Sequence, residues 1–181
     1  MHKRLFFIFL FFLVGILASA FASINLSNNQ SKYILKQIRK EITTVFLLKD
    51  FKLMEKSLAI PPSLFLRAST FYKIESQTKK IGYAIVVTAP SKTDVFEYLI
   101  LTDEDLKIKK AKVLIYREDY GGEIASKRWL SQFVNHSSDH TYVYGDNISA
   151  ISGATISVHS ITSSINHLFD FLRVLKLKGN I

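Results

Sequence analysis

Apolar residues recur every three or four positions in residues 31–46 and again in residues 157–176. This spacing is that of an amphipathic helix with one buried face, so we predict a helix in each segment. The apolar stripe of the second helix comprises Ile161, Ile165, Leu168, Phe169, Leu172 and Leu175. A third helix is predicted to follow the Gly121-Gly122 turn, and its apolar face comprises Ile124, Trp129 and Phe133.

Between the first helix and the Gly-Gly turn, the pattern changes to runs rich in aromatic and β-branched residues, which are typical of strands. Four such runs are predicted as strands, at residues 69–76, 81–89, 95–102 and 108–118. The connections between them are only a few residues long, which favours antiparallel neighbours over helical crossovers. Residues 134–147 are predicted to form a loop with a short strand at 141–144. A block of strands flanked by helices predicts an α+β fold, with an antiparallel sheet in one domain.

The N-terminal residues have the three parts of a secretory signal peptide. Lys3 and Arg4 form a basic start, residues 5–22 are uncharged and mostly apolar, and small residues follow A-x-A spacing near the end of this run. The run falls slightly short of the roughly 20 apolar residues of a membrane-spanning helix, so a cleaved signal peptide is favoured and an uncleaved anchor is the alternative. Both interpretations predict export, with residues 1–22 as signal peptide or anchor, 23–30 as linker and 31–181 as the domain.

The composition narrows the possible functions. The net charge is +9, but Lys and Arg are scattered and form no Arg-rich arm or nucleic-acid motif, so no nucleic-acid partner is predicted. A basic exported body instead favours an acidic redox partner or an anionic membrane surface. The chain has no cysteine, which excludes disulfides, cysteine-ligated iron–sulfur clusters and CxxCH haem sites. Any redox function therefore requires an organic cofactor.

Small residues crowd the segment before the last helix, in the sequence SAISGAT at residues 149–155. Gly153 and Ala154 would let a planar or phosphorylated group approach the backbone without a side-chain collision. A hydroxyl at Ser157 or Ser160 is predicted to cap the helix that follows, and the N-terminus of such a helix attracts phosphate groups. The residues alone leave two interpretations open, an anion site and a plain capped helix after a tight turn.

The segment ISGATIS resembles the flavinylation motif of the FMN-binding domain family. This family includes the flavin-carrying subunits of the ion-pumping NADH:quinone and ferredoxin:NAD oxidoreductase complexes. The resemblance implies that Thr155 carries covalent FMN through a phosphodiester bond, which a separate Mg-dependent flavin transferase makes from FAD. Ser152, Gly153 and Ala154 complete the motif. One position departs from the family's pattern, because Ser149 stands where an Asp usually precedes the motif.

The resemblance extends over about residues 33–175, in the order of strands, Gly-containing loop, Trp-containing helix and SGAT. In the family, the Gly-containing loop lies against the isoalloxazine ring of FMN. The corresponding stretch here is EDYGG, and the further cofactor-binding candidates are Glu118, Tyr120, Gly121 and Gly122. Glu118 would accept or relay protons near the ring, unless it belongs to an ordinary solvated turn. Trp129 is predicted to lie in the core, since a lone Trp at helical spacing with other apolar residues is usually buried.

These features together predict an exported flavoprotein electron carrier, in the periplasm or on the outer face of the cytoplasmic membrane. Its expected partners are the flavin transferase and a redox partner protein or quinone reductase subunits. The alternative is a non-catalytic exported module that binds FMN or another phosphorylated ligand reversibly, which Ser149 favours. No catalytic set and no metal site are predicted, because His136 and His140 lie in a polar loop without a clear third ligand. No G-x-G-x-x-G follows a strand, so no NAD site is visible.

Overall fold

The computed structural model describes residues 28–58, 67–77 and 79–181. The predicted signal peptide or anchor, residues 1–22, lies outside the described residues, as do residues 23–27 of the predicted linker. The chain divides into two compact units, residues 1–40 and residues 41–181. The second unit contains the sheet, the last helix and every candidate site residue, so it is the part that bears on function.

The first described helix runs through residues 28–46. It coincides with the helix predicted for residues 31–46 and also includes the last three residues that the sequence assigned to the linker. Among the described residues, no helix is both long enough and apolar enough to cross a membrane.

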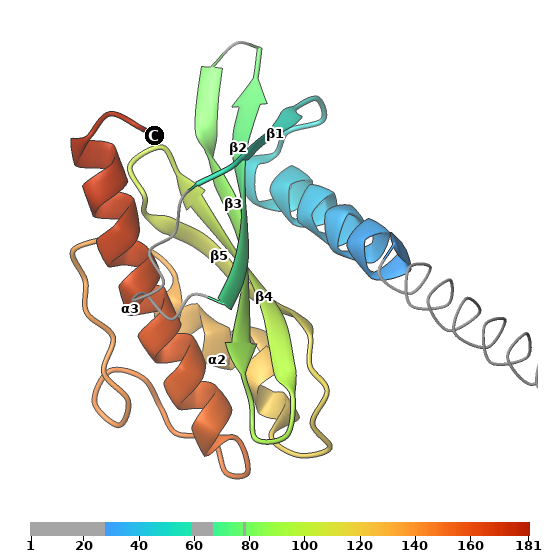
Figure 1. Ribbon diagram of the computed structural model, residues 1–181, viewed down its shortest axis with the longest axis vertical. Coiled ribbons are helices and arrows are strands. Elements are labelled where there is room, and N and C mark those ends of the chain that lie inside the picture. Colours follow the sequence, from blue (N-terminus) through green and yellow to red (C-terminus); the bar gives the residue numbers. More distant parts are fainter. Residues whose placement is uncertain (1–27, 59–66, 78) are drawn as a thin grey trace, which may run out of the picture. The chain divides into compact units, whose positions relative to one another are not determined.

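The second unit is built on a five-stranded antiparallel sheet, which confirms the predicted α+β fold (Figure 1). The strands follow one another across the sheet in chain order, as β1 (Lys52–Lys56), β2 (Arg67–Ser76), β3 (Lys79–Pro90), β4 (Val95–Asp103) and β5 (Ile108–Ile115). The last four correspond to the predicted strands, but β5 ends at Ile115, three residues before the predicted end at 118. The sequence of β1, KLMEK, has three charged residues and no β-branched one, so its pattern carries no strand signal.

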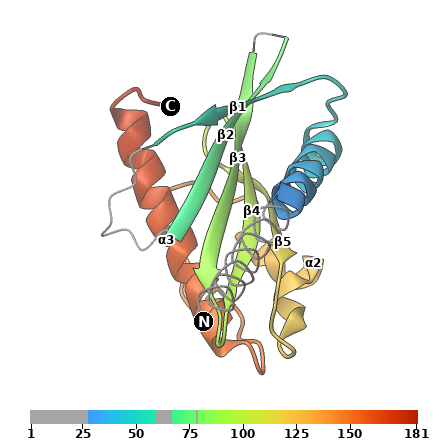
Figure 2. The ribbon, with the colours of Figure 1, turned by 45° about the vertical axis from the view of Figure 1, so that its right-hand side comes forward.

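The long C-terminal helix, α3 (Thr155–Leu177), lies along one face of this sheet (Figures 1 and 2). Strand register aligns apolar side chains from β2 to β5 in one row beneath the helix, namely Phe71, Ile85, Ile100 and Ala111. The predicted stripe of α3 is buried in the same core, which confirms it. Within this core the hydroxyls of Tyr98 on β4 and Ser164 on α3 lie 2.6 Å apart and share a hydrogen bond. The helix is therefore held by both apolar burial and one buried polar contact.

The helix predicted after the Gly-Gly turn is broken into three short pieces. These are η2 (Gly122–Ala125), α2 (Lys127–Leu130) and η3 (Ser131–Phe133). The break occurs at Ser126, whose side chain accepts a hydrogen bond from the backbone N–H of Trp129 and so starts a new turn. The predicted apolar face is nevertheless correct, because Ile124, Trp129 and Phe133 are all buried.

The strand predicted at residues 141–144 is not formed, and this segment makes only an isolated bridge between Tyr144 and Ile148. The side chain of Asn147 takes the place of a strand partner. Its amide oxygen accepts from the N–H of Val143 at 2.8 Å, and its amide nitrogen donates to the carbonyl of Thr141 at 3.0 Å. Such local side-chain hydrogen bonds compete with sheet pairing, which explains the irregular loop.

The packing of α3 on the sheet predicts that replacing two leucines of this helix by alanine will have very different effects on stability. Leu168 is fully buried, whereas Leu177 is 88% exposed. We expect Leu168→Ala to lower the free energy of unfolding by about 2–5 kcal/mol, because it opens a cavity in the core. The same substitution at Leu177 should change it by less than about 0.5 kcal/mol. Urea unfolding of both variants checks this, and equal effects would contradict the packing described.

Candidate functional site

Two glycine-containing segments meet at the start of α3. Gly121 has a φ of 74°, and a Cβ at this position would lie 2.4 Å from the Cβ of Ala154. Gly153 has a φ of 77°, and its Cβ position lies 3.5 Å from the Cβ of Tyr120. The small residues of SGAT and of the Gly-Gly loop therefore let two segments of the chain itself come together. The small residues before α3 are therefore required, in the first place, for this close approach of two backbone segments.

The helix α3 begins at Thr155, with Ala154 as its N-cap residue. The predicted caps are therefore wrong, since Ser157 and Ser160 both lie inside the helix. Ser157 is 2% exposed, and its hydroxyl lies 3.2 Å from that of Tyr116, so it serves the packing of the first turn. Among the described residues no side chain caps α3, and its first turn contains no acidic residue. Neither a capping side chain nor an acidic residue of the first turn therefore offsets the positive end of the helix dipole.

A cavity of about 280 Å³ opens at this helix end. One wall is formed by α3 and the residues before it, from Gly153 to Ser157. The opposite wall is formed after β5 by Tyr116, Glu118 and Tyr120, and Lys92 joins from the turn between β3 and β4. Thr155 is exposed and lines the cavity.

The structure brings most of the predicted cofactor-binding residues into this cavity. Five of them line it, namely Gly153, Ala154, Thr155, Glu118 and Tyr120. Gly121 packs against Ala154, and Ser152 is exposed beside it. Gly122 differs, because its Cβ position has no atom within 4 Å and the residue begins η2 instead. The sequence did not single out Lys92, Tyr116 or Ile156 as lining residues. Lys92 and Tyr116 lie far from the SGAT segment in sequence and belong to no motif, whereas Ile156 directly follows Thr155 in α3.

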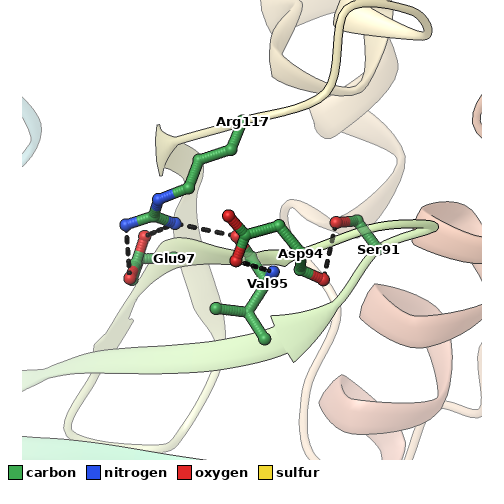
Figure 3. Close-up of polar contacts among 5 residues, drawn as sticks. All are labelled: Ser91, Asp94, Val95, Glu97 and Arg117. Carbon is green, nitrogen blue, oxygen red and sulfur yellow. Dashed lines mark hydrogen bonds and ion pairs between the residues drawn. The ribbon is translucent and has the colours of Figure 1, made fainter.

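Arg117 fastens the loop after β5 to the start of β4. Its guanidinium makes two hydrogen bonds to the carboxylate of Glu97, at 2.8 and 3.0 Å, and a third to the carbonyl of Val95 at 2.7 Å (Figure 3). Hydrogen bonding to Glu97 raises the pKa of Arg117 above its ordinary value. A forked contact of this kind fixes orientation as well as distance.

The next residue, Glu118, fastens the same loop to the turn between β3 and β4. Its carboxylate accepts from the N–H of Thr93 at 2.7 Å, from the hydroxyl of Thr93 at 2.9 Å and from the N–H of Asp94 at 3.3 Å. Hydrogen-bond donors in the turn at residues 91–94 lower the pKa of Glu118 to about 2. A carboxyl group with this pKa stays ionised near neutral pH. It is therefore suited to holding the turn and unsuited to relaying protons.

Trp129 lies in the core, as predicted, with its ring edge-on to Phe133 at a centroid distance of 5.3 Å. Its indole N–H donates to the carbonyl of Ser149 at 2.8 Å. The side-chain oxygen of Gln132 accepts from the N–H of Ser149, also at 2.8 Å. Two side chains therefore hold the backbone at position 149, while the Ser149 side chain itself is exposed and lines a second cavity of about 420 Å³.

The two histidines of the polar loop lie together. The rings of His136 and His140 are stacked with centroids 4.0 Å apart, and Tyr142 meets both rings edge-on. Burial lowers the pKa of His136, with smaller contributions from His140 and Lys107. No group of three or more His, Cys, Asp or Glu side chains with metal-binding geometry occurs in the part of the chain that the structure describes.

A comparison with protein families matches residues 93–170 to the model of the FMN-binding domain. The matched segment begins in the turn that Glu118 holds and ends within α3, so it contains the Gly-Gly loop, SGAT and Thr155. A search of curated proteins found no match to the chain.

The close approach of Gly121 and Ala154 predicts that replacement by alanine will destabilise the protein at Gly121 but not at the neighbouring Gly122. We expect Gly121→Ala to lower the free energy of unfolding by at least about 1–2 kcal/mol, because an L-residue disfavours this left-handed conformation and its Cβ collides with Ala154. Gly122→Ala should cost less than about 0.5 kcal/mol, since its Cβ enters open space. Urea unfolding measures both, and a harmless Gly121→Ala would contradict the close approach.

The hydrogen bonds to Glu118 predict an unusually acidic carboxyl group. Carbon-13 NMR should find its pKa near 2 in the folded protein, against an ordinary value of 4.5. Because the hydrogen bonds favour the ionised form, their contribution to stability is complete above about pH 4.5 and is lost as the pH falls towards about 2. Thr93→Val, which removes the hydroxyl that donates to Glu118, should raise this pKa. Titration of Glu118 near 4.5 in the unaltered chain would show that the carboxylate does not hold the turn.

Proposed function

We propose, from the match of residues 93–170 to the FMN-binding domain, that the chain is an exported flavoprotein with FMN attached to Thr155 through a phosphodiester bond. In this proposal it is an electron carrier that works within, or passes electrons to, a membrane-associated redox chain. Its location is the periplasm or the outer face of the cytoplasmic membrane. The observation that carries the proposal is the exposed Thr155 at the uncapped start of α3.

The residues present fit the phosphate end of FMN. A phosphodiester on Thr155 would place its negative charge at the N-terminus of α3, where no described side chain caps the helix. Interaction with the helix dipole favours such a charge by about 0.3–1 kcal/mol. The first turn contributes no carboxylate, and Lys92 adds a positive charge to the cavity. The Glu118 carboxylate also lines the cavity, but it accepts hydrogen bonds from Thr93 and Asp94. The local chemistry is therefore that of an anion site with a nucleophilic hydroxyl in it.

The residues around Thr155 also suit an apolar ring. Tyr120 and Ile156 both line the cavity and are 78% and 48% exposed, so each offers an apolar surface that the protein itself does not cover. Bound FMN supplies transfer of one or two electrons through its isoalloxazine ring. The protein's part is to hold the phosphate, to position the ring beside Tyr120, and to leave one side of the site open towards a redox partner.

Attachment from FAD requires one bond exchange. A P–O bond forms between Thr155 Oγ and the phosphorus of the FMN half, and the P–O bond of the pyrophosphate breaks, so that AMP leaves and the hydroxyl proton is released. The flavin transferase is the proposed partner for this step. The exposed Thr155 side chain is compatible with access by a second protein.

A second candidate function is reversible binding of FMN or another phosphorylated ligand by a non-catalytic exported module. The observation that favours it is Ser149, which stands where the family usually has an Asp and whose side chain is exposed. The backbone of this position is held by Trp129 and Gln132, so an Asp introduced there would occupy the same exposed place.

Intact-mass spectrometry of the full chain, coexpressed with a flavin transferase, tests the proposed function. We expect an added mass equal to FMN minus water, and we expect it to be absent from Thr155→Ala. Thr162→Ala serves as a matched control, because Thr162 is buried in α3 with its hydroxyl bonded to the carbonyl of Val158 and is therefore not accessible for attachment. This control should retain the added mass if it folds.

The outcomes separate the two candidate functions. Absence of added mass in the unaltered chain, together with its appearance in Ser149→Asp, would indicate that Ser149 prevents attachment. Flavin fluorescence quenching by the unaltered chain would then show whether it binds FMN reversibly. Added mass that persists in Thr155→Ala would contradict Thr155 as the attachment site. The same spectra report whether residues 1–22 have been removed from the exported protein.

A further inference from the structure

Lys92 is the one lysine among the described residues that line the cavity at Thr155. It lies in the turn between β3 and β4, far in sequence from the SGAT segment, and its side chain is exposed. Among the described residues, no carboxylate forms an ion pair with Lys92. Lys92 is exposed to solvent and can pair with an anion in the cavity that it lines, where Thr155 is the residue on which a phosphodiester would form.

The turn that carries Lys92 is rigidly built. The N–H and the hydroxyl of Ser91 each donate to the carbonyl of Asp94 at 2.8 Å, which closes the turn around Lys92. The Asp94 carboxylate accepts from the N–H of Val95 at 2.6 Å, where β4 begins (Figure 3). Lys92 therefore projects from a turn whose two ends are tied together.

Glu118 ties this turn to the loop on the opposite wall of the cavity. Three donors on Thr93 and Asp94 converge on its carboxylate, so the negative charge of Glu118 is already hydrogen-bonded on the side of the turn. Arg117 holds the neighbouring strand through Glu97 at the same time. The loop and the turn thus form one unit, and the distance from Lys92 to the start of α3 depends on it.

We propose that Lys92 is the side chain that pairs with the phosphate group of the flavin at Thr155, and that Glu118 is the positioning residue that holds the Lys92 turn beside it. The inference rests on the proposed function and adds to it a source of specificity for the phosphorylated flavin. The helix end attracts any anion by its dipole, whereas a lysine held in place adds a directed, salt-sensitive contact. The site then distinguishes FMN from riboflavin, which has the same ring and no phosphate.

The test uses the full chain produced without flavin transferase, titrated with FMN and with riboflavin by quenching of flavin fluorescence. The ratio of the two dissociation constants isolates the contribution of the phosphate group. We expect Lys92→Gln to reduce the preference for FMN about three- to fivefold, as for loss of a partly exposed ion pair, and to leave riboflavin binding within about twofold. Lys92→Arg should keep most of the preference.

Lys178→Gln is the matched control. It removes the same charge from an exposed position at the other end of α3, so it should leave the preference for FMN unchanged. If it reduces the preference as much as Lys92→Gln does, the effect belongs to the net charge of the protein and the proposal is wrong.

If Glu118 acts as a positioning residue, its removal changes the preference for FMN in the opposite direction to that expected from charge repulsion. Removing a carboxylate near a phosphate would strengthen FMN binding if repulsion dominated. If Glu118 acts by holding the turn, Glu118→Ala weakens the preference for FMN, and Glu118→Gln restores part of it, because the Gln oxygen still accepts from the Thr93 N–H. A stronger preference for FMN in Glu118→Ala overturns this role.

A measurement on the flavin-loaded protein covers the case in which reversible binding is too weak to titrate. Phosphorus-31 NMR should show a shifted phosphodiester resonance in Lys92→Gln and an unshifted one in Lys178→Gln. If the flavin is attached and its phosphodiester resonance is unchanged in both variants, the inference about Lys92 is wrong and the proposed function is unaffected. A chain that neither binds FMN nor gains its mass shows instead that the proposed function is wrong.

Discussion

The close approach of Gly121 to Ala154 is the constraint on which the site depends. A Cβ on Gly121 would lie 2.4 Å from the Cβ of Ala154, so the contact requires a glycine on one side and a side chain no larger than methyl on the other. It sets the loop after β5 directly against Ala154, the N-cap residue of α3. Since α3 is itself fixed on the sheet by its buried stripe, Thr155 is positioned by packed elements on both sides.

The long elements of this fold could be predicted because their patterns are decided by burial. α3 buries one stripe, so its apolar residues recur at helical spacing. Strands β3 and β4 are buried almost continuously, so they show in the sequence as runs of aromatic and β-branched residues. The short elements could not be predicted in the same way. At Ser126 a single side-chain hydrogen bond divides the expected helix, and at Asn147 an amide replaces a strand partner. Such local competition leaves almost no trace in the apolar pattern.

The candidate site was predictable to the extent that it is local in sequence. SGAT and the Gly-Gly loop are each short motifs, and both reach the cavity. The cap at Ser157 was wrongly predicted because the sequence does not show that Ser157 is buried in the first turn, with its hydroxyl hydrogen-bonded to that of Tyr116. Lys92 could not be predicted at all, since only the hairpin of β3 and β4, held by Glu118, brings it to the start of α3.

The size of the cavity explains why retaining the flavin and orienting its phosphate group would depend on different interactions. At about 280 Å³ it lies just below the range of about 300–1,000 Å³ in which proteins bury most of a small ligand, and its residues Tyr120 and Ile156 stay exposed. Such a site gains little affinity from burial, so a flavin held only by contacts would be lost from the exported protein that we propose, which would have no flavin pool around it. The proposed covalent bond at Thr155 would remove that difficulty. The charges at the helix end and at Lys92 then need only orient the phosphate, a task for which partly exposed interactions are strong enough.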